Sequence, residues 1–351
     1  MAPEGNIRQP EKKVPGVRRI VSAWRTLHPD TDRPTLVACS AGADSSALLL
    51  ALRTATDRLV AAHIRHDLRP DPETEADLNA ARSLAESLGI PFRHEMVRVR
   101  ELGGNAEAEA RGARYAALLR IASEKDCASI ALAHHADDQL ETVLMALFRG
   151  AGPGGLSGMP PSRTDPESGV RLIRPMLRVR RAEAEVICRA CGWAWREDAT
   201  NRDTDRLRAG LRHLVIPQLL QLRPDAPLRA CDAADLLRGC QELIEQEAAE
   251  LGEKAECRGA TARLDRGAAR QSSPVVLGQW IRDELRRISG GAGMDKVRAR
   301  EVAKVCRAIA DGSGEVRVFT LGPGAVRVER SHVIVEPSLV NSEEPSSMEE
   351  A

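Results

Sequence analysis

The stretch TLVACSAGADSSALLLAL, residues 35–52, determines how the rest of this chain can be arranged. Residues 36–39 are apolar and predict a buried strand, residues 40–44 predict a tight turn, and residues 45–52 predict a helix that begins with two hydroxyls. A helix N-terminus has unsatisfied N–H groups and partial positive charge, so small residues beside it let an anion approach. The stretch therefore predicts a phosphate site, and we expect the anion to be a polyphosphate.

The turn also has an interpretation without a ligand, as a strand-to-helix connection capped by Asp44 or Ser45. It is not a Walker A loop, because the GxxxxGK[ST] spacing is missing. It resembles instead the SGGxDS signature of PP-loop ATP pyrophosphatases, which implies that ATP is bound by Ser40, Ala41, Gly42, Ala43, Asp44 and Ser45. Ala41 departs from the glycine of that signature. If the position needs a positive φ, alanine costs about 1 kcal/mol or more there.

Apolar strands and amphipathic helices alternate along the first part of the chain. Strands are predicted at residues 59–64, 92–99 and 128–133, and helices at 17–27, 73–88 and 105–121. This alternation predicts an α/β fold with an open, mostly parallel, doubly wound sheet. Ligands of such sheets bind at the carboxyl ends of the strands, which is where the chemically dense segments of this sequence fall.

The segment HHADDQLET, residues 134–142, follows the predicted strand at 128–133. Asp138 and Glu141 are three residues apart at a helix start and share a face. Beside a polyphosphate, paired carboxylates suit Mg²⁺, which takes one or two carboxylates together with phosphate oxygens. The two residues are equally compatible with a capping box that needs no ligand.

Several motifs together resemble the tRNA(Ile)-lysidine synthase family, a branch of the PP-loop enzymes. They are found in that family's order over residues 35–217: the HHxDDQxET run at 134–142, the RGxGxxGLxGM run at 149–159, and the EDATN run at 197–201. Further matches are Arg111, Arg114 and Tyr115 on one helix, Arg174 with Pro175 on the next strand, and Arg208 with Arg212.

The resemblance implies an activity and its participants. Members of the family adenylate the wobble cytidine of an isoleucine tRNA with a CAU anticodon, and the side-chain amine of L-lysine then displaces AMP to give lysidine. ATP and Mg²⁺ are the implied cofactors. The implied residues are Asp44, Arg111, Asp138 and Glu141 for catalysis, His66 and His134 for ATP beside the turn, Asp44 and Asp138 for the metal, and Arg114, Arg174, Arg208 and Arg212 for tRNA.

Other departures keep three functions under consideration. Arg65 and Ala209 both replace an asparagine of the family's motifs. We expect a divergent lysidine synthase, with an RNA-binding relative that has lost catalysis as one alternative. A base-thiolating PP-loop enzyme is another, for which the CxxC pair Cys188 and Cys191 would be the only support. That pair is equally explained as two core residues of a helix.

Three side chains near these motifs also have structural interpretations. Arg111 can pair with Glu107, one helical turn earlier, instead of binding phosphate. Trp193 and Trp195 can stack on a splayed base, but they suit a hydrophobic core as well.

The length of 351 residues, 42% of them apolar, predicts about two domains. We expect an N-terminal extension at 1–30, a catalytic domain at 31–218, a smaller, mainly helical α+β domain at 219–340 that holds tRNA, and a disordered acidic tail at 341–351. In the smaller domain, residues 228–255 and 274–310 predict long helices, followed by strands at 315–320, 325–329 and 333–335. A further C-terminal domain of longer family members is expected to be absent.

Composition sets limits on partners and compartment. Fifty-one basic and fifty-one acidic residues cancel, so any surface for nucleic acid must be local. No signal peptide is recognisable and no stretch approaches the ~18 apolar residues of a membrane span. With eight cysteines in mostly apolar surroundings, we expect a soluble, cytoplasmic protein with reduced thiols. The sequence leaves the oligomeric state open and is compatible with a homodimer.

Overall fold

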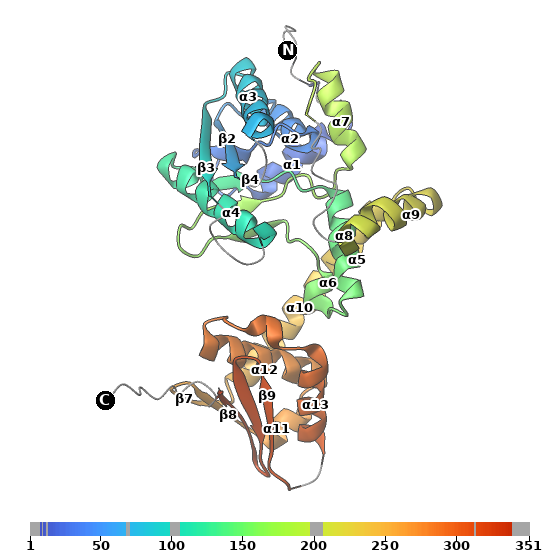
Figure 1. Cartoon of the computed structure of the whole chain (residues 1–351). Helices are drawn as coiled ribbons and strands as arrows, with labels where there is room; N and C mark the ends of the chain where they lie inside the picture. The colour runs from blue at the N-terminus through green and yellow to red at the C-terminus, as the bar shows by residue number, and fades with distance from the viewer. Residues whose placement is uncertain are drawn as a thin grey trace, which may run out of the picture. The chain divides into compact units, whose positions relative to one another are not determined.

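The chain folds into two compact units (Figure 1). The computed structural model describes residues 8, 10–11, 13–67, 71–98, 106–196, 206–311 and 314–338. The first unit comprises residues 1–150 and 155–235, and the second comprises residues 151–154 and 236–351. Helix α10, Ala226–Gly252, begins in the first unit and ends in the second. The functional boundary expected at residue 218 stays a prediction.

The first unit is built on a six-stranded sheet with the order β3-β2-β1-β4-β6-β5. Every neighbouring pair is parallel except β5 and β6. The predicted open, mostly parallel sheet is therefore confirmed. Its strands are β1 Thr35–Ala38, β2 Leu59–His66, β3 Phe92–Val97, β4 Ser129–Ala131, β5 Ser162–Thr164 and β6 Arg171–Ile173.

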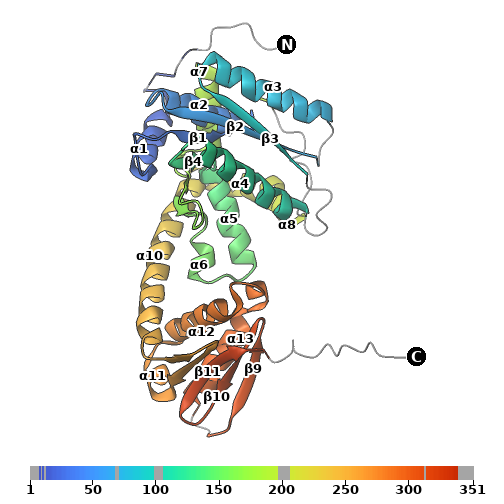
Figure 2. The same ribbon diagram turned by 90° about the vertical axis from the view of Figure 1, so that its left-hand side faces the viewer.

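Helices cover both faces of this sheet, which explains why its central strands are continuously apolar. Val37 faces a core shared with α1, α2, α3 and α7, whereas Leu36, its neighbour in β1, faces a core shared with α4. Figure 2 shows α4 on the side opposite to α1 and α2. These helices are α1 Val17–Leu27, α2 Ala43–Arg53, α3 Asp71–Ser87, α4 Ala106–Glu124 and α7 Arg181–Ala190.

The strand order reverses at β1, which pairs with β2 on one side and β4 on the other. A crevice opens at such a switch point, beyond the carboxyl ends of the strands. The turn after β1 and the start of α5, Ala136–Phe148, after β4 both lie there. The fold thus brings the two motif-rich segments to one edge of the sheet.

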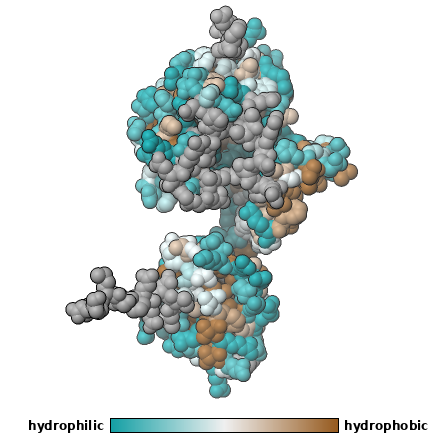
Figure 3. Space-filling view, viewed as in Figure 1, coloured by the Kyte–Doolittle hydropathy of each residue, from teal (hydrophilic) through white to brown (hydrophobic). Residues whose placement is uncertain are grey.

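The remaining helices of the first unit follow the sheet. The short α6, Pro153–Leu156, spans the division between the units. A nearly continuous helical segment then consists of α8 Arg206–Gly210, a π-helical turn at Leu211–Val215 and α9 Ile216–Leu222. Apolar side chains are exposed along this segment, as Figure 3 shows over α9, among them Leu214 and Leu222.

The second unit has its own core and a five-stranded antiparallel sheet of order β7-β8-β11-β10-β9. Its strands are β7 Glu256–Arg258, β8 Thr261–Asp265, β9 Arg317–Leu321, β10 Gly324–Val328 and β11 His332–Pro337. Its helices after α10 are α11 Arg266–Gln271, α12 Pro274–Ser289, a 3₁₀ turn Met294–Lys296 and α13 Ala299–Ala310. The α+β character expected for this part is confirmed.

Three details of the predicted elements were wrong. The helix expected over 274–310 is divided, because Gly290 ends α12 in the left-handed region with φ 58°. Strands β5, β7 and β8 were missed. Arg174 was expected on a strand, but β6 ends at Ile173 and Arg174 follows it.

No helix within the described ranges is long and apolar enough to cross a membrane. The EDATN run at 197–201 and the tail at 341–351 lie outside the described residues.

Candidate active site

The turn between β1 and α2 is braced from within by Ser45. Its hydroxyl accepts a hydrogen bond from the Ser40 N–H at 3.0 Å and donates to the Gly42 carbonyl at 3.3 Å. Gly42 is the N-cap residue and no side chain caps the helix. The alternative in which Asp44 or Ser45 caps α2 is therefore wrong, and the first N–H groups of the helix have no side-chain acceptor.

Ala41 takes up the left-handed backbone conformation that the turn requires, with φ 66°. Its methyl group is fully buried in the core and its carbonyl accepts a hydrogen bond from the Arg196 N–H at 3.1 Å. From the sequence, a strained alanine is expected if this position needs a positive φ. The position has a positive φ, so Ala41 is strained.

A cavity of about 300 Å³ begins at this turn. The turn contributes Ser40, Gly42, Asp44 and Ser45, whereas the side chains of Ala41 and Ala43 are buried. The far walls are largely apolar, with Ala62, Ile64, Leu118 and Leu132. Polar groups on the lining are His63, Arg65, Thr74, Asp77, Arg114, Tyr115, His134 and Arg196. A pocket of this size, with apolar walls and many polar groups, suits a small polar ligand.

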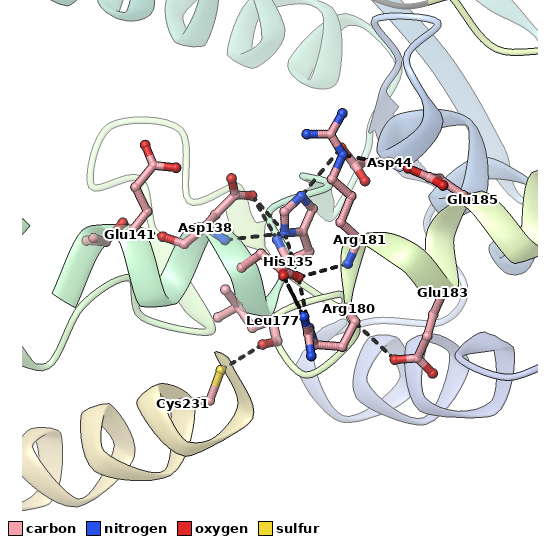
Figure 4. A network of polar contacts seen from close by, with 12 residues as sticks. Asp44, His135, Asp138, Glu141, Leu177, Arg180, Arg181, Glu183, Glu185 and Cys231 are labelled. Atoms are coloured by element: carbon pink, nitrogen blue, oxygen red, sulfur yellow. Dashed lines mark hydrogen bonds and ion pairs between the residues drawn. The ribbon is translucent and has the colours of Figure 1, made fainter. Parts of the chain in front are cut away.

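His135 joins the turn to the start of α5 (Figure 4). Its Nδ1 accepts a hydrogen bond from the Asp138 N–H at 3.3 Å, while the Asp138 carboxylate accepts one from the His135 N–H at 3.0 Å. Nε2 of the same ring lies 3.5 Å from Oδ2 of Asp44. The capping box at this helix thus consists of His135 and Asp138, so the box expected between Asp138 and Glu141 is wrong.

Asp44 and Asp138 consequently lie on opposite sides of one imidazole ring. Burial disfavours a charged ring, but the hydrogen bond with Asp44 and the charges of Asp138, Asp44 and Asp137 raise the pKa of His135 to about 9. Burial raises the pKa of Asp138. Oδ1 of Asp44 is buried without a hydrogen-bond partner. An oxygen in that position is available to a cation or a donor that enters the cavity.

Glu141 is turned toward a different set of partners. It is 3% exposed and forms ion pairs with Arg208 and with Arg212, the latter at 2.8 Å. Arg208 and Arg212 are four residues apart and share one side of their helical segment, and Arg212 lies in the π-helical turn at Leu211–Val215. The two arginines expected to bind RNA therefore hold a carboxylate expected to act in catalysis.

The arginines of α4 lie beside the cavity. Arg114 lines it, and Arg111 donates a hydrogen bond to the Tyr115 hydroxyl at 3.1 Å. The side chain of Glu107 lies outside the described part, so the alternative pair with Arg111 is not described. Arg174 is only 5% exposed and donates to the Pro160 carbonyl at 2.7 Å.

His134 is neutral over the physiological range. Burial, together with the charges of Arg174, Arg111 and Arg114, lowers its pKa to about 3. Its Nδ1 is buried and has no hydrogen-bond partner. A neutral ring on the cavity wall suits hydrogen bonding to an uncharged heterocycle. His66 ends β2, but its side chain lies outside the described part.

Several residues of the cavity were not assigned to the site from the sequence. His63 is 6% exposed, and its Nδ1 lies 2.8 Å from the Cys39 carbonyl oxygen. Arg65 forms an ion pair with Glu75 of α3 at 2.7 Å. Arg196 forms one with Asp77 at 2.5 Å. The position of His63 and Arg65 at the end of a predicted strand was the available signal.

The CxxC pair belongs to the core. Burial raises the pKa of Cys188 to about 12 and that of Cys191 to about 11, so neither is a reactive thiolate. Trp193 is 5% exposed and its Nε1 donates to the Ser46 hydroxyl. Of the eight cysteines, only Cys240 and Cys257 are exposed.

Known proteins are similar in sequence to most of this chain. A family model described as a PP-loop domain matches residues 17–219. The tRNA(Ile)-lysidine synthase of Ralstonia nicotianae is 38% identical over 317 residues, which are 86% of this chain and 65% of that protein. The tRNA(Ile)-lysidine synthase of Deinococcus radiodurans is 36% identical over 316 residues, 89% of this chain and 49% of that protein. The chain thus spans about half to two thirds of the length of these curated relatives.

Among solved structures, a U34-tRNA thiolase from Methanococcus maripaludis has a similar fold, with a TM-score of 0.51 and 16% identity. The match covers 64% of this chain and 81% of that one. The family model includes the strained turn after β1 and the carboxylates at the start of α5. Sequence and fold agree, and the chain belongs to the PP-loop family.

Proposed function

We propose that this protein is a tRNA(Ile)-lysidine synthase, which uses ATP to join lysine to C2 of the wobble cytidine of a CAU-anticodon isoleucine tRNA. The observation that carries the proposal is the meeting of the PP-loop turn with Asp44 and Asp138 across His135. The names of the two curated relatives supply the substrate class.

ATP suits the cavity with its phosphates at the turn after β1 and its adenine at the opposite end. Its phosphates suit the first turn of α2, where the N–H groups lack side-chain acceptors. The adenine suits the apolar walls beyond, where neutral His134 can form a hydrogen bond with it. This orientation leaves the α-phosphate near Asp44.

Asp44 is the carboxylate of the cavity that fits Mg²⁺, because it lines the cavity and has a buried oxygen without a partner. Asp138, the second expected ligand, does not line the cavity and lies across the ring of His135, so it would have to move to share the ion. Carboxylate oxygens are hard ligands of the kind that Mg²⁺ prefers, with its other ligands drawn from water and phosphate. When bound, the metal would neutralise charge on the phosphates.

The chemistry takes place in two displacements. The cytidine O2 attacks the α-phosphorus of ATP, and pyrophosphate leaves. The lysine ε-amine, after losing a proton, then attacks C2, and AMP leaves with the former O2. A carboxylate near the amine can accept that proton. Asp138 is the better candidate, because its raised pKa brings it closer to the operating pH.

Glu141 and its two arginines have a coupled role in this proposal. Arg208 and Arg212 remain partly exposed, at 41% and 31% of the side chain, while they hold the buried Glu141. A tRNA phosphate that formed an ion pair with either arginine would compete with Glu141 and change the position of its side chain. Arg174, in contrast, is too buried for a direct RNA contact, and we propose that it fixes the loop at Pro160.

The thiolase alternative has little support. Sulfur transfer needs an accessible thiolate, whereas Cys188 and Cys191 are 0% and 1% exposed. Cys188 also donates its S–H to the Ala43 carbonyl at 3.3 Å, behind the phosphate turn.

The test is a reaction of the purified full chain with the CAU-anticodon transcript, ATP, Mg²⁺ and lysine. We expect a wobble cytidine heavier by one lysyl group in mass spectrometry of the nucleosides, formed with release of AMP. Pyrophosphate exchange with tRNA but no lysine would support adenylation alone. A protein that binds the tRNA but gives neither signal would be an inactive relative, and the proposal would be wrong.

A further inference from the structure

Tyr115 on α4, the only tyrosine of the chain, gathers two arginines from distant parts of the first unit. The guanidinium carbon of Arg111 lies 5.2 Å from the centroid of its ring, and that of Arg163 on β5 lies 5.1 Å from it. Arg111 also donates a hydrogen bond to the ring hydroxyl. Such cation–π contacts stabilise the position of a cation without neutralising its charge.

The charge in this group is only partly offset, since the charge of Arg163 contributes, after the hydrogen bonds from Ser168, to lowering the pKa of Asp165, but Arg163 and Asp165 form no ion pair within the described chain. Within the described ranges, neither Arg111, Arg114 nor Arg163 forms an ion pair with a carboxylate. Asp165 is close in sequence to Arg163, but its carboxylate accepts hydrogen bonds from the N–H and hydroxyl of Ser168. Arg111 and Arg163 are exposed. The low pKa of His134 is a second sign of positive potential at this wall.

This positive group is separate from the phosphate-binding turn. The first turn of α2 already provides donors for a nucleotide's phosphates. Tyr115 and Arg114 line the cavity, while Arg163 comes from the edge strand β5. Exposed guanidinium groups at an open edge suit bidentate contacts with a phosphate of a large substrate.

We propose that Arg163 and Arg111, held against the ring of Tyr115, bind a backbone phosphate of the RNA substrate next to its wobble cytidine. Tyr115 is a positioning residue, because it acts through the two arginines. This inference rests on the proposed function for the identity of the RNA, and it adds Arg163 and Tyr115 to the substrate-binding residues.

The experiment compares Arg163→Ala with Arg25→Ala, which removes the same charge from an exposed site on α1, on the opposite face of the sheet. Binding of the CAU-anticodon transcript is measured against salt concentration. We expect Arg163→Ala to lower the slope of log K against log salt by about 1, as for one lost phosphate contact, and Arg163→Lys to restore it. Arg25→Ala should leave the slope unchanged.

Steady-state kinetics and Tyr115 variants complete the test. Arg163→Ala should raise KM for tRNA several-fold and leave KM for ATP and kcat unchanged. Tyr115→Leu should weaken RNA binding as much as Arg163→Ala, and the double variant should add little, whereas Tyr115→Phe keeps the ring and should have a smaller effect. Circular dichroism checks that each variant is folded.

Two results would overturn this inference, and a third would overturn the proposed function alone. An unchanged salt slope in folded Arg163→Ala would overturn the inference. A raised KM for ATP with an unchanged slope would assign the arginines to the nucleotide and overturn it as well. Wild-type protein that makes no lysidine but shows the expected slopes would overturn the proposed function and leave the phosphate contact supported.

Discussion

Ala41 combines a strained backbone with a fully buried methyl group. The positive φ costs an L-residue about 1–2 kcal/mol, whereas burial of one methyl contributes about 0.8 kcal/mol. We expect Ala41→Gly to change the free energy of unfolding by less than about 1 kcal/mol, because the two effects oppose each other, and to retain activity. Urea denaturation measures the change. Ala41→Val is the control, and it should destabilise by about 3 kcal/mol because a β-branched residue is poorly tolerated at this φ.

Asp44 and Glu141 stabilise different partners, so their substitutions test two contacts. Asp44→Asn should lower the adenylation rate by orders of magnitude and should also lower stability at neutral pH, because His135 loses the carboxylate that its Nε2 faces at 3.5 Å. Glu141→Gln should lower both, with a loss of about 2 kcal/mol, because two arginines lose their carboxylate. Pyrophosphate exchange and urea denaturation give the two quantities. Near-normal exchange in Asp44→Asn would remove Asp44 from the site.

His135 predicts how stability depends on pH. Its pKa is raised to about 9 in the folded protein, above about 6.5 in the unfolded chain. The second proton binds Nδ1, where it replaces the hydrogen bond from the Asp138 N–H by an interaction with the Asp138 carboxylate 3.5 Å away. The stabilisation from this proton is fully present below pH ~6.5 and lost as pH rises toward ~9. We expect the free energy of unfolding to fall over this range by a few kcal/mol. His135→Asn keeps a side chain that can cap α5, and it should flatten that decline; an equal decline in the variant would contradict the assignment.

Only some of the individual residues of the site could be predicted from the sequence. The placement of Asp44, Asp138 and His134 was predicted because they follow strands whose carboxyl ends meet at one edge, whereas their roles came from the family resemblance and stay predictions. The contact of Arg163 with the ring of Tyr115 was not predicted, because β5 is three residues long and gives no periodic signal. The pairing of Glu141 with Arg208 was missed because it depends on the phase of a helix that the residues alone do not reveal.

The π-helical turn at Leu211–Val215 sets that phase. A π turn holds one residue more than an α turn, so the residues before it are rotated by about 100° relative to those after it. Deleting Leu214, which is 72% exposed, should convert the turn to α-helix and move Arg208 and Arg212 away from Glu141. We expect activity to fall about as far as in Glu141→Gln, and the combined variant to be no worse. Additive losses would show that the turn acts elsewhere.

Among the elements, the strength of the apolar pattern decided what could be predicted. The helices at α1 and α10 and the apolar strand β1 were found because each has a clear apolar pattern. Strand β8 joins the second sheet through backbone pairing with β11, and β7 pairs with β8; the three residues of β7 are all exposed. A strand whose side chains face solvent leaves little apolar periodicity to recognise.

Two separate cores predict that the molecule unfolds in two steps. Arg266 is 3% exposed and donates to the carbonyls of Ala308, Ile309 and Glu329, which ties α11 to the end of α13 in the second unit. Arg266→Ala should lower only the calorimetric transition of that unit, by about 3 kcal/mol. Leu49→Ala, in the core of the first unit, is the matched change and should lower the other transition. A single transition shifted by both variants would contradict this.

The distribution of cysteines confines thiol labelling of the native protein to one of its two units. Both exposed thiols, Cys240 and Cys257, lie in the second unit, and the other six are buried. A maleimide dye added to the native protein should therefore tag only that half, with no engineered residue. Fluorescence from such a dye would report when RNA arrives at the half of the chain that lies farthest in sequence from the PP-loop turn.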